Sequence, residues 1–188
     1  MANGGDQIME RRGSRWRLAG WGIAGLVLLL PLAAMQFTNE VRWDWKDFVF
    51  AGVLIGTVGA AFELTVRRTG NWAARAGVAA ALAAAFLIIW ANGAVGMIGD
   101  EDNPYNLLFV GVIAVALLGA VAARFRAAGM ALAMGVAAIL HAAVAVGGMF
   151  SDLRGGLFSA GFACVWLLSS ALFRHAAREQ SGEGGEVT

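Results

Sequence analysis

The sequence predicts an all-α integral membrane protein, a bundle of six transmembrane helices. The chain of 188 residues is 59% hydrophobic and only 14% charged, whereas soluble domains are about half apolar and about a quarter charged. Its apolar runs approach or exceed the ~20 residues that a helix needs to cross ~30 Å of hydrocarbon. Because these runs are continuous rather than alternating, they favour helices over the strands of a membrane barrel.

Six apolar runs define the expected elements in order. They cover residues 18–37, 47–66, 74–98, 105–123, 128–149 and 156–173. Together they form one predicted transmembrane domain, residues 15–176. Residues 1–14 and 177–188 are polar and glycine-rich, and the sequence predicts that they are disordered tails.

The arginines predict the orientation, because they fall before the first run and then in every second connection. They are Arg11, Arg12, Arg15, Arg17, Arg67, Arg68, Arg75, Arg124, Arg126, Arg174 and Arg178. The other connections hold seven acids and three bases: Glu40, Arg42, Asp44, Lys46, Asp47, Asp100, Glu101, Asp102, Asp152 and Arg154. The positive-inside rule places the arginine side in the cytoplasm, so we expect a bacterial inner-membrane protein with both termini cytoplasmic. Trp43, Trp45 and Tyr105 are expected anchors at the outer interface, and Trp16 and Trp72 at the inner one.

A weak internal repeat aligns the second and fourth runs. Phe50-Ala51-Gly52-Val53 matches Phe109-Val110-Gly111-Val112, and the match extends to Arg67 and Arg126. Three repeated helical hairpins would explain it, and so would chance similarity between spans built from few residue types. The many alanines and glycines in these runs predict close helix packing.

Composition also excludes several classes of function. The net charge of +1 and the scattered arginines argue against nucleic-acid binding. Cys164 is the single cysteine, so no intrachain disulfide or cysteine-based metal cage can form. We expect no cofactor, no metal and no catalytic residues, since nucleophile, zinc-site and phosphate-loop motifs are missing from the sequence. A haem bound by two histidines is not expected, because His175 belongs at the cytoplasmic end of the last span and His141 lies within the fifth.

His141 is the first candidate for an intramembrane polar site, since it falls near the bilayer midplane. An ionisable side chain at that depth is a functional hypothesis by default. The alternative is a neutral histidine that makes one or two interhelical hydrogen bonds. Thr57, Cys164, Trp166 and Ser169 are its expected neighbours in depth.

Glu63 and Asn92 complete this candidate site. Glu63 precedes Arg67 by one helical turn, which predicts either an ion pair at the cytoplasmic boundary or an intracellular gate or proton acceptor. Asn92 lies in the outer part of the third span, where its amide needs a partner, either another helix or a substrate.

An acidic loop connects the third and fourth spans and contains Asp100, Glu101, Asp102 and Asn103. The three acids could hold a hard cation at the periplasmic side, although the spacing of a calcium loop is missing. Helix-start chemistry is the alternative, with Asn103 as the N-cap and Pro104 at the first helical position. The two interpretations are compatible.

The segments Phe62–Asn71, Trp90–Asn92 and Ile98–Pro104 together resemble a family of uncharacterised small multi-pass bacterial inner-membrane proteins. The resemblance covers most of the region from Asp47 to Arg126. It implies a helical inner-membrane protein and supplies no catalytic residue. If Glu63, Asn92 and the acidic loop belong to the family pattern, they should be tested before His141.

Small size and dense small-residue packing favour a non-enzymatic accessory or structural subunit of a membrane assembly, in contact with lipid and with a larger complex or further copies of itself. The outward excess of acids and the hairpin repeat favour the alternative, a cation- or proton-coupled transporter of a small solute.

Overall fold

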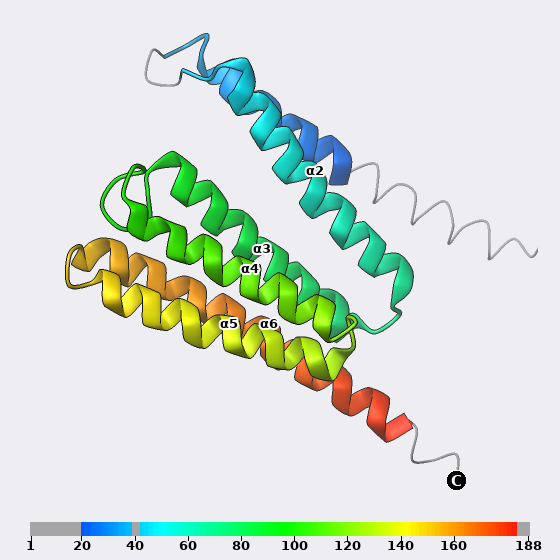
Figure 1. Cartoon of the computed structure of the whole chain (residues 1–188). Helices are drawn as coiled ribbons and strands as arrows, with labels where there is room; N and C mark the ends of the chain where they lie inside the picture. The colour runs from blue at the N-terminus through cyan, green and yellow to red at the C-terminus, as the bar shows by residue number, and fades with distance from the viewer. Residues whose placement is uncertain (1–19, 39–41, 184–188) are drawn as a thin grey trace, which may run out of the picture. The chain divides into compact units, whose positions relative to one another are not determined.

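A computed structural model describes residues 20–38 and 42–183 of the chain. All regular structure in these ranges is helical: α2 (Trp45–Arg68), α3 (Trp72–Ala94), the short 3-10 helix η1 (Pro104–Asn106), α4 (Leu107–Ala122), α5 (Ala127–Gly148) and α6 (Leu153–Glu183) (Figure 1). A shorter apolar helix covers Gly20–Ala34. The predicted tail 1–14, the first four arginines, Trp16 and Glu40 lie outside the described residues.

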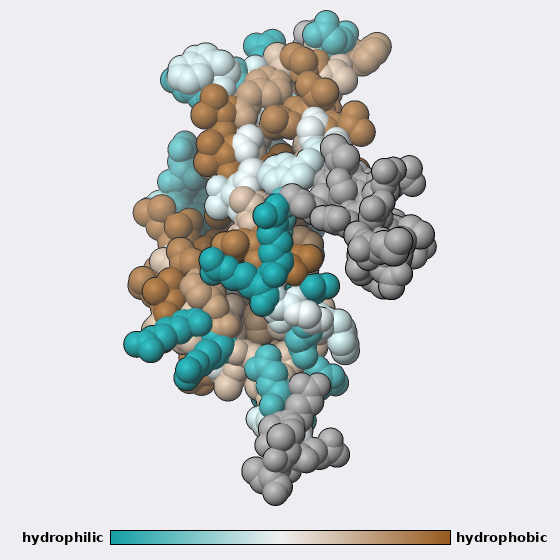
Figure 2. All heavy atoms as spheres, turned by 90° about the vertical axis from the view of Figure 1, so that its right-hand side faces the viewer, coloured by the Kyte–Doolittle hydropathy of each residue, from teal (hydrophilic) through white to brown (hydrophobic). Residues whose placement is uncertain are grey.

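Five of these helical segments are long and apolar enough to cross a membrane. The prediction of an all-α chain built from membrane-spanning helices is therefore confirmed in outline. Many large apolar side chains are exposed on the helices, among them Leu117, Leu132 and Ile139, as expected of surfaces that face lipid (Figure 2).

The chain divides into two compact units between Ala60 and Ala61. In the first unit, the Gly20–Ala34 helix packs against the first part of α2 through glycines. A Cβ at Gly52 would lie 3.7 Å from Leu28, and one at Gly59 would lie 3.0 Å from the ring of Trp21. Small residues thus allow these two helices to approach closely.

The second unit contains the bundle of α3, α4, α5 and α6. Helix α6 packs along α5 and along α3, and α4 packs against α5, whereas α3 and α4 touch little. Its core combines alanines with a few large side chains that are fully or almost fully buried, namely Ile88, Phe109, Trp166 and Phe173. Helix α6 is therefore the element that joins α3 to the α4–α5 pair.

Helix backbones in this bundle meet at glycine and alanine. A Cβ on Gly119 of α4 would lie 2.8 Å from Cβ of Ala133, and one on Gly129 of α5 would lie 2.5 Å from Cβ of Ala123. At the other end of α5, a Cβ on Gly156 would lie 2.8 Å from both the carbonyl oxygen of Ala145 and the amide nitrogen of Met149. Because those last two atoms belong to the backbone, this contact cannot relax by a rotamer change.

Two buried serines of α6 bond to neighbouring helices. The Ser169 hydroxyl donates to the Gly77 carbonyl of α3 at 2.8 Å, and the Ser170 hydroxyl donates to the Ala131 carbonyl of α5 at 2.7 Å. Both serines are at most 1% exposed. Consecutive residues of one helix thereby bond to two different partners.

The predicted third span, 74–98, is too long at its C-terminal end. Helix α3 ends at Ala94, and the backbone turns at Gly96 and Gly99, whose φ angles are +74° and +72°. Met97 and Ile98 remain buried although they belong to the connection. Hydropathy alone cannot separate such a buried loop from a helix.

The predicted C-terminal tail also differs, because α6 continues beyond residue 176 to Glu183. Ala176 is fully buried, and Glu179 accepts a 2.8 Å hydrogen bond from the Asn71 side chain. Asn71 also caps α3 by accepting from the Ala74 amide at 2.9 Å. The hydrogen bond between Glu179 and Asn71, at the start of α3, stabilises the helical conformation of the residues after 176.

The expected hairpin repeat finds no support in the packing of the described helices. The α5–α6 pair is in contact along its length and the α3–α4 pair is not. The aligned phenylalanines also differ in environment, since Phe50 is 51% exposed and Phe109 is fully buried.

We predict that Gly156→Ala destabilises the bundle by about 1–3 kcal/mol, because the added methyl group overpacks against the α5 backbone. Gly161→Ala on the same helix is the matched control: its Cβ would have no neighbour within 4 Å. The control should be neutral or stabilising by up to about 1 kcal/mol through helix propensity. Equilibrium unfolding in mixed micelles measures both variants, and equal stability of the two would contradict this account of the packing.

Candidate functional site: the intramembrane polar groups and the outer loops

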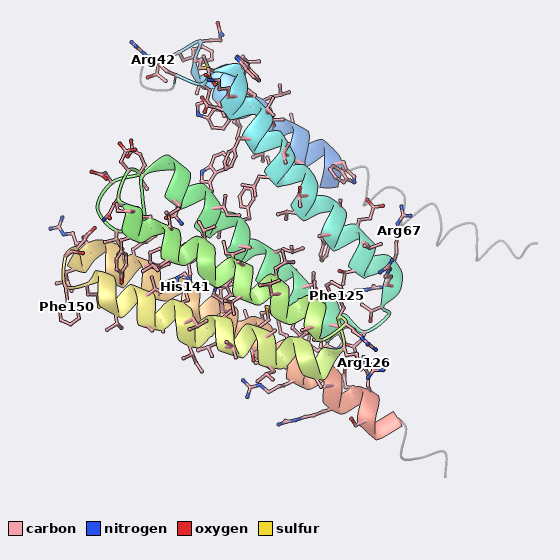
Figure 3. The ribbon with its side chains drawn as sticks, in the orientation of Figure 1. Arg42, Arg67, Phe125, Arg126, His141 and Phe150 are labelled. Carbon is pink, nitrogen blue, oxygen red and sulfur yellow. The ribbon has the colours of Figure 1, made fainter. Side chains whose placement is uncertain are left out.

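His141 lies in α5 and is fully buried. Its Nε2 is 3.1 Å from the carbonyl oxygen of Ser159 on α6 and 3.4 Å from the Ser159 hydroxyl. The rings of Phe109 and Phe162 lie at centroid distances of 5.1 and 6.1 Å from the imidazole. His141 is thus an interhelical contact in an aromatic pocket between α4, α5 and α6 (Figure 3).

The Ser159 carbonyl defines the tautomer of this histidine. A carbonyl oxygen only accepts, so the 3.1 Å contact requires a hydrogen on Nε2. With Nε2 as the donor, that nitrogen cannot take a proton from the Ser159 hydroxyl. In this tautomer Nε2 does not act as a base toward the Ser159 hydroxyl, which lies 3.4 Å away.

The sequence did not single out Ser159, although one signal pointed to it. His141 and Ser159 lie at equal distances along the chain from Phe150, which is in the short connection between α5 and α6. Antiparallel helices joined by a short connection bring such residues opposite each other. Cys164 was one of the expected neighbours of His141, but it is exposed on the surface of α6.

Three buried polar atoms have no hydrogen-bond partner in the part of the chain that the structure describes. They are Nδ1 of His141, Nε1 of Trp166 and Oδ1 of Asn92. A buried polar group without a partner costs free energy, so each of these atoms calls for an explanation.

Glu63 and Asn92 bond within their own helices. The Arg67 guanidinium donates to Glu63 at 2.6 Å, one turn along α2, so the predicted ion pair is present. The Asn92 amide donates to the carbonyl of Ile88 at 3.0 Å, one turn back along α3. Its expected bond to another helix is not found among the described residues.

The acids of the connection between α3 and α4 are exposed, and two asparagines organise the loop. Asn103 caps η1 by accepting from the Tyr105 amide at 3.0 Å, and Pro104 is the first residue of that helix. The predicted cap is confirmed, although α4 itself begins only at Leu107. Asp100, Glu101 and Asp102 point no carboxylate into the bundle, and within residues 20–38 and 42–183 no group of three His, Cys, Asp or Glu side chains could hold a metal ion.

Asn106 is the buried centre of this loop and was not anticipated. Its Oδ1 accepts from the amides of Met97 and Ile98 at 3.2 and 2.9 Å, and its Nδ2 donates to the Asp100 carbonyl at 2.8 Å. These bonds satisfy backbone groups of the loop itself, beyond the end of α3. The loop is therefore a built structure rather than a flexible acidic segment.

Asp152 connects this loop to the start of α6. One carboxylate oxygen accepts from the Gly155 amide at 2.9 Å, and the other accepts from the Gly99 amide at 3.0 Å. The hydrogen bond from Gly155 and then the one from Gly99 stabilise the charged form, so they hold the pKa of the Asp152 carboxyl below its usual value. Tyr105, an expected interface anchor, instead donates to the Val144 carbonyl of α5 at 2.7 Å.

Comparisons of this chain with family models, curated proteins and solved structures give no match.

We predict that Asp152→Asn lowers the unfolding temperature at neutral pH, because one amide oxygen cannot replace two carboxylate acceptors. A carboxyl whose pKa is lower in the folded than in the unfolded state stabilises the folded state at pH values above its unfolded-state pKa. This contribution is lost as the pH falls through the folded-state pKa. The difference in unfolding temperature between wild type and variant should therefore be constant near neutral pH. It should become smaller below about pH 3.8, the ordinary pKa of this carboxyl. Thermal unfolding in detergent across this range measures it.

Asp102→Asn is the matched control, since this exposed carboxyl lies in the α3–α4 connection that Asp152 contacts through Gly99. It should leave the unfolding temperature at neutral pH unchanged. A gap for Asp152→Asn that persists unchanged in acid would show that ionisation is not what stabilises the contact.

We also predict that His141→Leu destabilises the bundle by about 0.6–1.7 kcal/mol, the range for interhelical hydrogen bonds in membrane proteins. Ser159→Ala removes the hydroxyl but keeps the carbonyl acceptor, so its effect should be smaller. Equilibrium unfolding in mixed micelles compares the two. If Ser159→Ala cost more than His141→Leu, the hydroxyl rather than the carbonyl would carry the interaction.

Proposed function

We propose that this chain is a non-enzymatic, multi-pass membrane protein that acts as an accessory or structural subunit of a larger membrane assembly. The observation that carries the proposal is the fully buried contact between His141 and Ser159, which uses the most deeply placed ionisable group to join two helices. A carrier or enzyme needs such a group to reach a substrate or water.

The other candidate residues support the same proposal. Glu63 bonds to Arg67, and the Asn92 amide bonds to Ile88, so each has a partner on its own helix. At the outer end, Asn103 and Asn106 are used to build the loop. These arrangements stabilise a scaffold and assemble no reaction centre.

The membrane arrangement that fits this role has six crossings, with both termini in the cytoplasm of a bacterial inner membrane. The Gly20–Ala34 helix spans about 22 Å at 1.5 Å per residue, and the longer apolar run 18–37 would complete the first crossing. The basic connections support the orientation. In a Cys164→Ser background, Ser151→Cys should react with an impermeant maleimide in intact cells, and Arg124→Cys only after lysis; the reverse pattern would invert the topology.

Purification from the native membrane tests the role itself. A tagged chain extracted in mild detergent should elute with other subunits, or further copies of itself, in fixed stoichiometry. The mass of the complex, measured by light scattering, distinguishes an assembly with other subunits from a homo-oligomer of this chain. A monomer in every mild detergent would contradict the proposal.

A cation- or proton-coupled transporter of a small solute is the second candidate, favoured by the three buried atoms without a partner on His141, Trp166 and Asn92. Polar atoms of this kind can line a hydrated path. Proteoliposomes with an entrapped pH-sensitive dye would then show proton uptake that falls in His141→Ala and in Glu63→Gln. Uptake no greater than in empty liposomes, or unchanged in both variants, would eliminate this mechanism.

A further inference from the structure

We propose that the connection between α4 and α5 binds the headgroup of an anionic phospholipid, with Arg124 and Arg126 contacting its phosphate. The inference goes beyond the proposed function and requires only that α4 and α5 cross a lipid bilayer. We call residues Ala123–Arg126 the α4–α5 turn.

The arginines at this end of the bundle fall into two groups. Some have partners within the protein: Arg67 bonds to Glu63, Arg75 donates to the carbonyls of Val66 and Thr69 at 2.9 and 2.7 Å, and Arg174 donates to the Ser170 hydroxyl at 3.2 Å. These guanidinium groups stabilise the fold.

Arg124 and Arg126 belong to the other group. Both are exposed, and neither guanidinium group makes a hydrogen bond or an ion pair with any residue in the described ranges. Of the acids at this end whose side chains the structure describes, Glu63 pairs with Arg67, and Glu179 contacts His175 and Asn71. Two neighbouring cations are thus left without a counter-charge from the bundle itself.

The backbone of the α4–α5 turn fixes where these side chains emerge. Arg124 and Phe125 have φ angles of +50° and +58°, in the left-handed region that residues other than glycine rarely adopt. The Phe125 amide donates to the Ala120 carbonyl at 3.1 Å, and the Arg126 amide donates to the Ala123 carbonyl at 3.0 Å. In this short, hydrogen-bonded connection the side chains of Arg124, Phe125 and Arg126 are all exposed.

Phe125 stands between the two arginines in the sequence and is 65% exposed; Figure 3 labels it together with Arg126. An exposed aromatic ring between cations suits the interface, where the ring meets acyl chains and the guanidinium groups meet phosphates. Arginine is particularly suited to phosphate, since its planar fork donates two parallel hydrogen bonds.

Apolar surface on both helices favours a lipid over a free phosphate ion. Leu118 and Val121 in the last turns of α4 are 68% and 54% exposed, and Leu132 near the start of α5 is 71% exposed. A lipid can place its headgroup on the α4–α5 turn while its chains lie along these side chains. Two unpaired guanidinium groups also favour a headgroup with net negative charge over a zwitterionic one, which brings its own cation.

Lipid binding to the full-length protein in a mild non-ionic detergent tests the proposal. Native mass spectrometry measures the affinity for phosphatidylglycerol and for phosphatidylcholine. We expect wild type to prefer phosphatidylglycerol. The double variant Arg124→Gln/Arg126→Gln should lose about fivefold in phosphatidylglycerol affinity for each arginine removed. The phosphatidylglycerol affinity of Arg124→Lys/Arg126→Lys should lie between those of wild type and the glutamine double variant, since lysine keeps the charge but lacks the planar guanidinium group.

Arg154→Gln is the matched control. Arg154 is also exposed, and it lies in the first turn of α6, at the end of the bundle away from the α4–α5 turn. It should bind phosphatidylglycerol like wild type, and circular dichroism verifies that every variant is folded. Wild-type affinity in the glutamine double variant would overturn the proposal, and so would equal affinity for the two lipids. Displacement of the lipid by an excess of inorganic phosphate would identify a free-anion site instead.

Discussion

Close approach of helix backbones is the constraint on which the α3–α6 bundle depends. Lipid is as apolar as leucine, so burying apolar side chains between helices gains little there, and dispersion contacts and interhelical hydrogen bonds must hold the helices together. Gly119 against Ala133, Gly129 against Ala123 and Gly156 against the α5 backbone provide the short distances. The bonds from Ser169 and Ser170 to carbonyls of α3 and α5 become feasible only at such distances.

The same constraint explains why polar side chains in the loops are so fully used. Beyond the end of α3, the amides of Met97 and Ile98 belong to no helix, and Asn106, which is 5% exposed, accepts from both. Asp152 serves in the same way for Gly99 and for the first turn of α6. The C-terminal end of α3 and the N-terminal ends of α4 and α6 are therefore linked by side chains that cap backbone groups, and the acids of the α3–α4 connection remain at the surface.

Much of the fold was accessible from the sequence, because hydropathy reports directly on what lipid requires. The helical class and the positions of α2 to α5 follow from it to within a few residues, and spacing alone predicted the pair of Glu63 and Arg67. Met97 and Ile98 were misassigned because a buried loop and a helix have the same hydropathy. Asn106, Asp152 and Ser159 were missed for another reason: each acts on residues distant in the sequence, and a polar residue near a helix end does not reveal which backbone groups it will meet.

Helix α6 has one further consequence. It runs without interruption from the cap at Asp152 to Glu179, which bonds to Asn71 at the start of α3. Between these ends it is joined to α5 and α3 by Ser159, Ser169 and Ser170. Because both ends and the middle of α6 are bonded to other elements, a displacement of one end of this helix would strain contacts along its whole length.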